Sequence, residues 1–278
     1  MGHQAHADQT WNELYGELRL GEPGHWAPLP RVCGSRDKCW ADAAARRPSD
    51  DSELARIARP WVGPRYEELG LLVLGINMNE HGGYDAMVKL VERAKEDLET
   101  GARRLRFGNP ARGEGGYAGT LLFHRVGAYV AYFAARAELA PLELRPDGFP
   151  IAKLVARSFD LIAMTNQVKC SPQRELSKPT EGMWRHCGQM VLRRELRVLR
   201  PRQILVLGTE NRDHLGALCF DSEVTSWKPS GRLLTEAHAR LDGQPVRVIA
   251  APHPHRRGYD VMQALRDLDG ALLSQAPV

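Results

Sequence analysis

The sequence lacks any apolar run that approaches the roughly 18 residues needed by a membrane-spanning helix. Its polar start, residues 1–10, also lacks the apolar core of a secretory signal. Internal repeats and low-complexity tracts are absent as well, which argues against a repeat array or a chain without a packed core. We therefore expect a cytoplasmic protein with no membrane partner.

Cysteine is scarce, and no strong excess of one charge is present. Five cysteines in a cytoplasmic chain are more often reduced thiols or metal ligands than disulfides. The net charge of +4 and the pI near 8.9 suit a polyanionic partner, although many proteins without such a partner are equally basic. The length of 278 residues allows one large α/β domain or two small ones, and the apolar content of 43% allows a proper core. A single unit is the default expectation.

Four short apolar runs alternate with segments of helical periodicity. The runs predict buried strands at 71–74, 161–164, 204–207 and 246–250. Helices are expected at about 85–99, 120–137, 181–199, 211–218 and 259–273. This order predicts a three-layer α/β/α fold with a central four-stranded, mostly parallel sheet. Residues 1–62 are predicted to form an irregular extension, and residues 63–278 the main domain.

Polar residues follow the ends of three predicted strands. Asn77 comes after the first strand, Asn166 after the second and His253 after the fourth. In parallel sheets the ligand crevice lies outside the carboxyl ends of the strands. These three side chains are therefore the first candidates for a functional site.

The segment around Asn166 carries the most specific motif. Residues 165–172 read TNQVKCSP, Cys187 follows, and the strand at 204–207 is closed by Gly208. In order and spacing this stretch resembles the iron–sulfur class of uracil-DNA glycosylases.

Two shorter motifs flank this stretch. Residues 75–77, GIN, resemble the first active-site motif of the mismatch-specific and single-strand-selective branches. Residues 251–255, APHPH, resemble the second motif of the superfamily. The resemblance covers residues 71–259 and implies a fold of the uracil-DNA glycosylase type.

The resemblance implies roles that fit the chemistry of cleaving an N-glycosidic bond. Asn77 would position the attacking water, and His253 would donate a hydrogen bond to the oxyanion of the departing base. Asn166 would read the base, because one amide offers both a donor and an acceptor. Gly75, Ile76 and Asn79 would line the pocket. Glu80 and His81 are rival polar groups in the same loop, and Glu80 could supply a true base.

A base inside a duplex has to be flipped into such a pocket. The resemblance places His255, Arg256 and Arg257, directly after the histidine motif, against the DNA backbone. An aromatic side chain should stack on the flipped base, and the candidates are Tyr84, Phe107 and Tyr117.

Four cysteines occur as two pairs, and the resemblance implies that they hold a [4Fe–4S] cluster. They are Cys33, Cys39, Cys170 and Cys187. The first pair is separated by five residues, where the family usually has two or three, so zinc remains an alternative. Cys219 is left over and is expected in the core.

The expected function is that of a monomeric DNA glycosylase in base-excision repair, acting on uracil or a related deaminated base such as hypoxanthine. Two alternatives remain open from the sequence. One is a uracil- or damaged-DNA-binding module of the same fold without turnover. The other is a four-cysteine metal protein of a different function.

Overall fold

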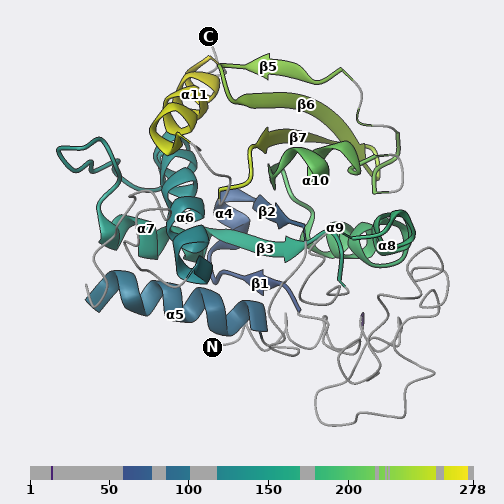
Figure 1. The fold of residues 1–278 in the computed structure, drawn as a ribbon, viewed down its shortest axis with the longest axis horizontal. Coiled ribbons are helices and arrows are strands. Elements are labelled where there is room, and N and C mark those ends of the chain that lie inside the picture. The colour runs from purple at the N-terminus through teal and green to yellow at the C-terminus, as the bar shows by residue number, and fades with distance from the viewer. Residues whose placement is uncertain are drawn as a thin grey trace.

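A mixed β-sheet organises the chain (Figure 1). The structure, a computed structural model, describes residues 14, 59–76, 86–100, 118–169, 179–216, 219–222, 224, 226–254 and 260–274. Within these residues the sheet has seven strands in the order β1-β3-β2-β4-β7-β6-β5. Their bounds are β1 Trp61–Val62, β2 Leu71–Gly75, β3 Ile162–Asn166, β4 Gln203–Leu207, β5 Lys228–Ser230, β6 Leu234–Leu241 and β7 Gln244–Ala251.

The four expected strands form the parallel middle of this sheet. β2 pairs in parallel with β3 and β4, and β4 pairs in parallel with β7. The expectation of four strands was nevertheless wrong, because antiparallel β1 borders β3 and antiparallel β6 and β5 extend the other edge. β6 reads LTEAHARL, a sequence that alternates between buried and more exposed side chains. It therefore shows none of the continuous apolar character by which the other strands were recognised.

Helices cover both faces of the sheet. Their bounds are α4 Tyr66–Leu69, α5 Ala86–Thr100, α6 Ala118–Arg136, α7 Ala152–Ser158, α8 Glu181–Cys187, α9 Arg193–Leu199, α10 Thr209–Asp213 and α11 Val261–Leu273. A 3-10 turn, η3 (Phe159–Leu161), precedes β3, and a π-helical turn, η4 (Gly188–Leu192), joins α8 to α9. The expected helix at 181–199 is thus interrupted, the one at 211–218 is shorter and shifted, and α7 was not expected.

Successive side chains of β2 enter two separate cores, as the pleat of a strand requires. Leu71 and Val73 pack with residues of α5, α6, α7 and α11. Leu72 and Leu74 pack on the opposite face with residues of η4 and α9. All four side chains are fully buried, and each contributes about 1.5–3 kcal/mol to folding. The three-layer arrangement follows from this two-sided burial.

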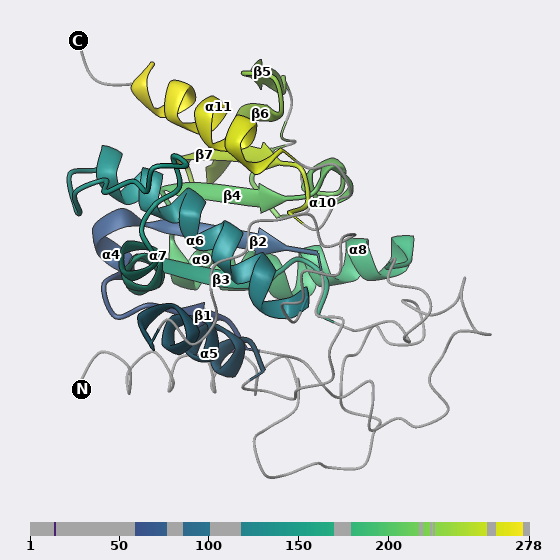
Figure 2. The ribbon, with the colours of Figure 1, turned by 60° about the vertical axis from the view of Figure 1, so that its left-hand side comes forward.

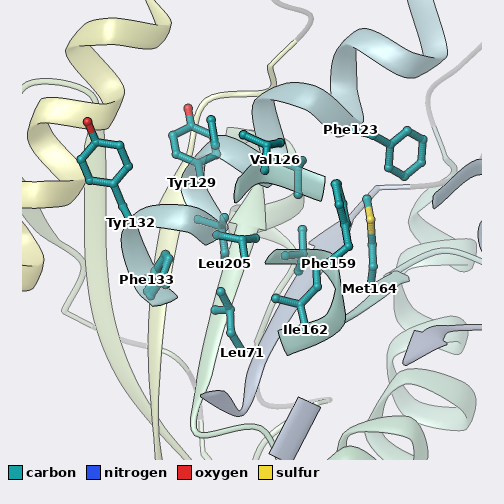
Figure 3. Packing of buried hydrophobic residues seen from close by; sticks show 14 of the residues in the cluster. Leu71, Phe123, Val126, Tyr129, Tyr132, Phe133, Phe159, Ile162, Met164 and Leu205 are labelled. Carbon is teal, nitrogen blue, oxygen red and sulfur yellow. The ribbon is translucent and has the colours of Figure 1, made fainter. Parts of the chain in front are cut away.

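α6 lies at the centre of the first core. Figure 3 shows its side chains, among them Val126 and Tyr129, gathered near Leu71, Ile162 and Leu205 of the sheet. The helix also packs against α7, α5 and α11. α6 thus packs against both the sheet and the neighbouring helices of this core.

The predicted N-terminal extension, residues 1–62, lies mostly outside the described residues. Leu14 is buried in the core that contains η4 and α9. Trp61 of β1 pairs with Met164, and its indole N–H donates to the carbonyl of Phe159 at 3.0 Å. These contacts join parts of the extension to the main domain, and the boundary at residue 62 stays a prediction.

Gly127 offers a test of how tightly α6 meets α7. A Cβ at this position would collide with Val155 Cγ1 and lie 2.9 Å from Phe159 Cε2. We expect Gly127→Ala to lower the free energy of unfolding by about 1–3 kcal/mol, because overpacking outweighs the helix propensity of alanine. Equilibrium unfolding in urea measures this change.

The matched control is Gly270→Ala in α11. Gly270 is exposed, and no heavy atom lies within 4 Å of the position that its Cβ would take. Alanine should therefore stabilise the protein by about 0.5–1 kcal/mol. A stabilising effect of both substitutions would contradict the packing described for α6 and α7.

Candidate functional site

The carboxyl ends of the four parallel strands lie along one edge of the sheet. Figure 2 shows the arrowheads of β2 and β4 directed to the same side of the molecule, where α10 and α8 lie. Gly75 and Asn166 are the last residues of β2 and β3, and Gly208 directly follows β4. His253 follows β7 by two residues. This is the edge at which open α/β sheets bind ligands.

Asn166 lies against the backbone of the neighbouring strand. It pairs with Gly75 in the parallel ladder, and a Cβ at residue 75 would collide with the Asn166 Oδ1 atom. Only a glycine there leaves room for the amide. The side chain is buried, with 8% of the residue exposed, and its Oδ1 faces the backbone of Gly75. A buried amide at this edge of the sheet is suited to bind a polar ligand.

Gly208 occupies the corresponding place beside His253. Its φ of +99° is one that side-chain-bearing residues rarely adopt. The open side of Gly208 faces Ile76 and His253, whose nearest atoms lie 3.5 Å from where a Cβ would be. Its backbone N–H donates to the carbonyl of Ala251 at 2.7 Å, which ties the start of the histidine loop to β4.

The strand order fixes how far apart the two candidate side chains begin. Asn166 belongs to β3 and His253 follows β7, with β2 and β4 between them. Three spacings of about 4.8 Å separate these backbones by about 14 Å. Asn166 and His253 therefore begin at the two ends of this row of four strands, with Gly75, Ile76 and Gly208 at the ends of the strands between them.

A buried polar network lies behind Asn166. The Lys169 ammonium donates to Glu195 Oε2 at 2.7 Å and also to the hydroxyl of Thr165. The Thr165 hydroxyl donates to the same carboxylate at 3.0 Å. The Lys169 and Glu195 side chains are 2% and 0% exposed, so this ion pair is fully withdrawn from water. It joins both ends of the Thr165–Lys169 segment, and hence Asn166, to α9.

Cys187 is the one predicted metal ligand within the described residues. It is buried among Val168, Met183 and Trp184 at the end of α8. Its Sγ accepts a hydrogen bond from the backbone N–H of Lys169 at 3.4 Å, and Lys169 immediately precedes Cys170 in the sequence. N–H donors of this kind tune cysteine-ligated clusters, so the surroundings of Cys187 fit a ligating thiolate.

Cys219 has a different environment. It is fully buried in the core with η4 and α9, as expected, and burial raises the pKa of its thiol to about 12. Such a thiol stays protonated at neutral pH and is unsuited to binding a metal.

Several predicted site residues lie outside the described residues. They are Cys33, Cys39, Asn77, Asn79, Tyr84, Tyr117, Cys170, His255, Arg256 and Arg257, together with the rival groups Glu80, His81 and Phe107. Among the residues that are described, no three potential metal ligands lie together. The cluster, the water-positioning asparagine and the DNA-contacting arginines therefore stay predictions.

α10 contributes a residue that the sequence did not reveal. The Asn211 side chain is fully buried, and its Nδ2 donates to the carbonyl of Leu74 at 2.9 Å. This bond holds the short helix over the end of β2. Its sequence signal is weak, because a polar residue after a strand and glycine is most often a simple turn residue.

Residues 139–269 match the family model of the uracil DNA glycosylase superfamily. The match contains Asn166, Lys169, Cys187 and His253, and it begins after the first motif at residues 75–77. The resemblance to the superfamily is thus confirmed over this range, and the branch stays a prediction. A search of the curated proteins finds no match. In the described part of the chain, no helix is long and apolar enough to cross a membrane.

The buried ion pair behind Asn166 can be tested directly. Lys169→Met removes the ammonium that faces Glu195 and leaves a carboxylate in an interior without water. We expect a loss of about 3–5 kcal/mol in the free energy of unfolding, measured in urea. Replacing both partners, Lys169→Met with Glu195→Leu, should recover part of this loss.

The exposed pair between Arg197 and Asp242 provides the control. Their side chains are 48% and 53% exposed, and their closest atoms are 3.0 Å apart. Arg197→Met should cost less than about 1 kcal/mol. Equal losses for the two single variants would contradict a special contribution of the buried pair.

Proposed function

We propose that this chain is a DNA glycosylase of the uracil DNA glycosylase superfamily that removes uracil, or a related deaminated base such as hypoxanthine, from DNA. The observation that carries the proposal is the buried amide of Asn166, which lies against Gly75 at the strand ends. The family match over residues 139–269 and the net charge of +4 support it. We propose further that the protein acts as a monomer.

The proposed reaction is hydrolysis of the N-glycosidic bond of a flipped nucleotide. The bond between sugar and base breaks, its electron pair stays with the base, and a water oxygen bonds to the anomeric carbon. The proton that this water loses passes through solvent to the released base. Asn77 would orient this water through its side-chain carbonyl. His253 would donate a hydrogen bond to the oxyanion that forms on the base, which lowers the cost of the departing charge.

Asn166 would select the base. Its Nδ2 can donate to a carbonyl oxygen while its Oδ1 accepts from a ring N–H, which is the pattern on one edge of uracil. Cytosine presents the opposite pattern. The absence of a side chain at Gly75 allows this amide to lie along the strand end, so Gly75 takes part in selection without contacting the base through a side chain of its own.

The nucleotide would be flipped out of the stack to reach these groups. We propose His255, Arg256 and Arg257 as contacts to the DNA backbone, and Tyr84 or Tyr117 as the stacking aromatic. Ile76 is half-buried beside His253 and Gly208 and would form part of the apolar pocket wall, with Asn79 nearby in the sequence.

Cys187 would hold a [4Fe–4S] cluster together with Cys33, Cys39 and Cys170, and zinc is the alternative metal. A bound cluster would cross-link these distant segments through its thiolate ligands. The buried Sγ of Cys187 and the N–H of Lys169 that it accepts from are compatible with a thiolate. The ligand set would thereby join the N-terminal extension to the segment that carries Asn166.

An excision assay tests the proposed activity. Oligonucleotides carrying uracil, hypoxanthine or xanthine, single- or double-stranded, are incubated with the protein, and free base and abasic sites are measured. We expect release of at least one of these bases. Asn166→Ala and His253→Ala should each lower the single-turnover rate by about 10²- to 10³-fold, the cost of removing one aligned donor. Gly75→Ala should lower it as well, because its methyl group displaces the amide.

His238→Ala is the control, since His238 is 69% exposed on β6 and far from the strand ends. It should leave the rate unchanged. Retained affinity for lesion-bearing DNA without any released base would favour the binding module over the enzyme. No release and no affinity, unaffected by Asn166→Ala and His253→Ala, would favour a metal protein of another function.

Metal analysis tests the cluster separately. Cys187→Ala should lose bound iron and visible absorption, because one of four ligands is removed. Cys219→Ala should retain both, since the Cys219 thiol is a protonated core group. Iron and zinc contents of the purified proteins are the measurement. Equal metal content in wild type and Cys187→Ala would exclude Cys187 as a ligand.

A further inference from the structure

A charged side chain is buried within the most apolar helix of the structure. α6 reads AGTLLFHRVGAYVAYFAAR, and Arg125 lies in its middle with 4% of the residue exposed. Its helical neighbours Val126 and Tyr129 are fully buried in the core. Removing a guanidinium from water is costly unless its donors find acceptors. The position of those acceptors therefore indicates what the arginine is for.

One acceptor of the Arg125 guanidinium lies in the loop that carries His253. Arg125 Nη1 donates a hydrogen bond to the backbone carbonyl of Pro254, 129 residues away in the sequence. Pro254 is buried and directly follows the candidate catalytic histidine. The long arginine side chain thus reaches from the core helix to the rim of the candidate site.

The same loop is held at its other end by β4. The carbonyl of Ala251 accepts the Gly208 N–H at 2.7 Å, and His253 packs against the open side of Gly208. Pro252 and Pro254 flank the histidine, and the ring of each fixes its own φ. His253 therefore lies between two conformationally restricted residues. A backbone carbonyl on each side of it, that of Ala251 and that of Pro254, accepts a hydrogen bond.

We propose that Arg125 is a positioning residue for His253. By holding the Pro254 carbonyl it closes the loop on the side that β4 does not reach, and it thereby fixes the direction in which the imidazole approaches the strand ends. This proposal rests on the glycosylase function proposed above. A displacement of about 1 Å at a reacting group can cost on the order of 100-fold in rate. A hydrogen bond that holds the loop of His253 in place, called the clamp below, would therefore have a large effect on the rate.

Arg125→Met tests the clamp, because methionine fills a similar volume without a donor. We expect the single-turnover excision rate to fall about 10- to 100-fold. The Kd for lesion-bearing DNA should change less than twofold, because the loop backbone rather than a DNA contact is disturbed. Arg125→Lys retains one charged donor and should recover part of the rate. Melting temperatures of both variants report whether they fold.

A double-variant cycle separates positioning from a general structural effect. If Arg125 acts through His253, then Arg125→Met should have little further effect in a His253→Ala background. Arg136→Met is the matched control on the same helix, since Arg136 forms a surface ion pair with Asp269. It should leave the rate within twofold of wild type. Equal losses from Arg125→Met in both backgrounds, or no loss in either, would overturn the proposal.

A spectroscopic measurement keeps this proposal independent of turnover. In protein with isotope-labelled histidine, the ring signals of His253, assigned through His253→Gln, should shift in Arg125→Met and stay in place in Arg136→Met. The exposed His238 should be unaffected in both. If wild-type protein released no base, the proposed function would fail and these signals would still decide about the clamp. An unshifted His253 signal in folded Arg125→Met would overturn it.

Discussion

The parallel pairing of β2 with both of its neighbours is the constraint on which the candidate site depends. β2 aligns Leu71 with Ile162 of β3 and with Gln203 of β4, so all three strands end at nearly the same level. β7 continues this alignment through β4. Because backbone hydrogen bonds set the register, residues from four distant segments reach one edge of the sheet. A slip of one residue would turn every core side chain of β2 to the opposite face.

At this edge two glycines leave room for neighbouring side chains, and buried charged residues support the segments that carry those side chains. Gly75 admits the amide of Asn166, and Gly208 admits His253 and Ile76. The supporting groups come from different layers: Lys169 and Glu195 from one side of the sheet, Arg125 from the other. Both supports are buried charges, which rarely occur without a specific partner. The strand ends are thus supported from both faces of the sheet.

The sequence predicted the parts of the fold whose burial is uniform. The runs at 71–74 and 204–207 are buried on both faces and therefore consist of apolar residues alone. One face of β6 is more exposed than the other and carries polar residues, so the strand has no continuous apolar run. Its turn to β7 does carry a recognisable pair, Asp242-Gly243, and both residues have a positive φ. Such a pair between two strands is a strong hairpin signal.

For the site, the sequence indicated positions but not supports. Asn166 and His253 could be proposed from the sequence because they follow strands within recognisable motifs. The Lys169–Glu195 pair could not, since two charged residues 26 positions apart show no pattern that distinguishes burial from exposure. The contact of Arg125 could not be predicted either, because it is made to a backbone carbonyl, a group that every residue possesses. Partners of this kind depend on tertiary packing alone.

The π-helical turn η4 has a geometric consequence for the segment behind Asn166. Cys187 and Glu195 are eight residues apart, which in an unbroken α-helix would rotate them about 80° away from each other. A π-helical turn closes its hydrogen bond one residue later, and absorbing that residue reduces the rotation to about 20°. Both side chains then face Lys169, one at its backbone N–H and the other at its ammonium. The number of residues between Cys187 and Glu195 therefore sets the rotation that lets Lys169 contact both the Cys187 thiol and the Glu195 carboxylate.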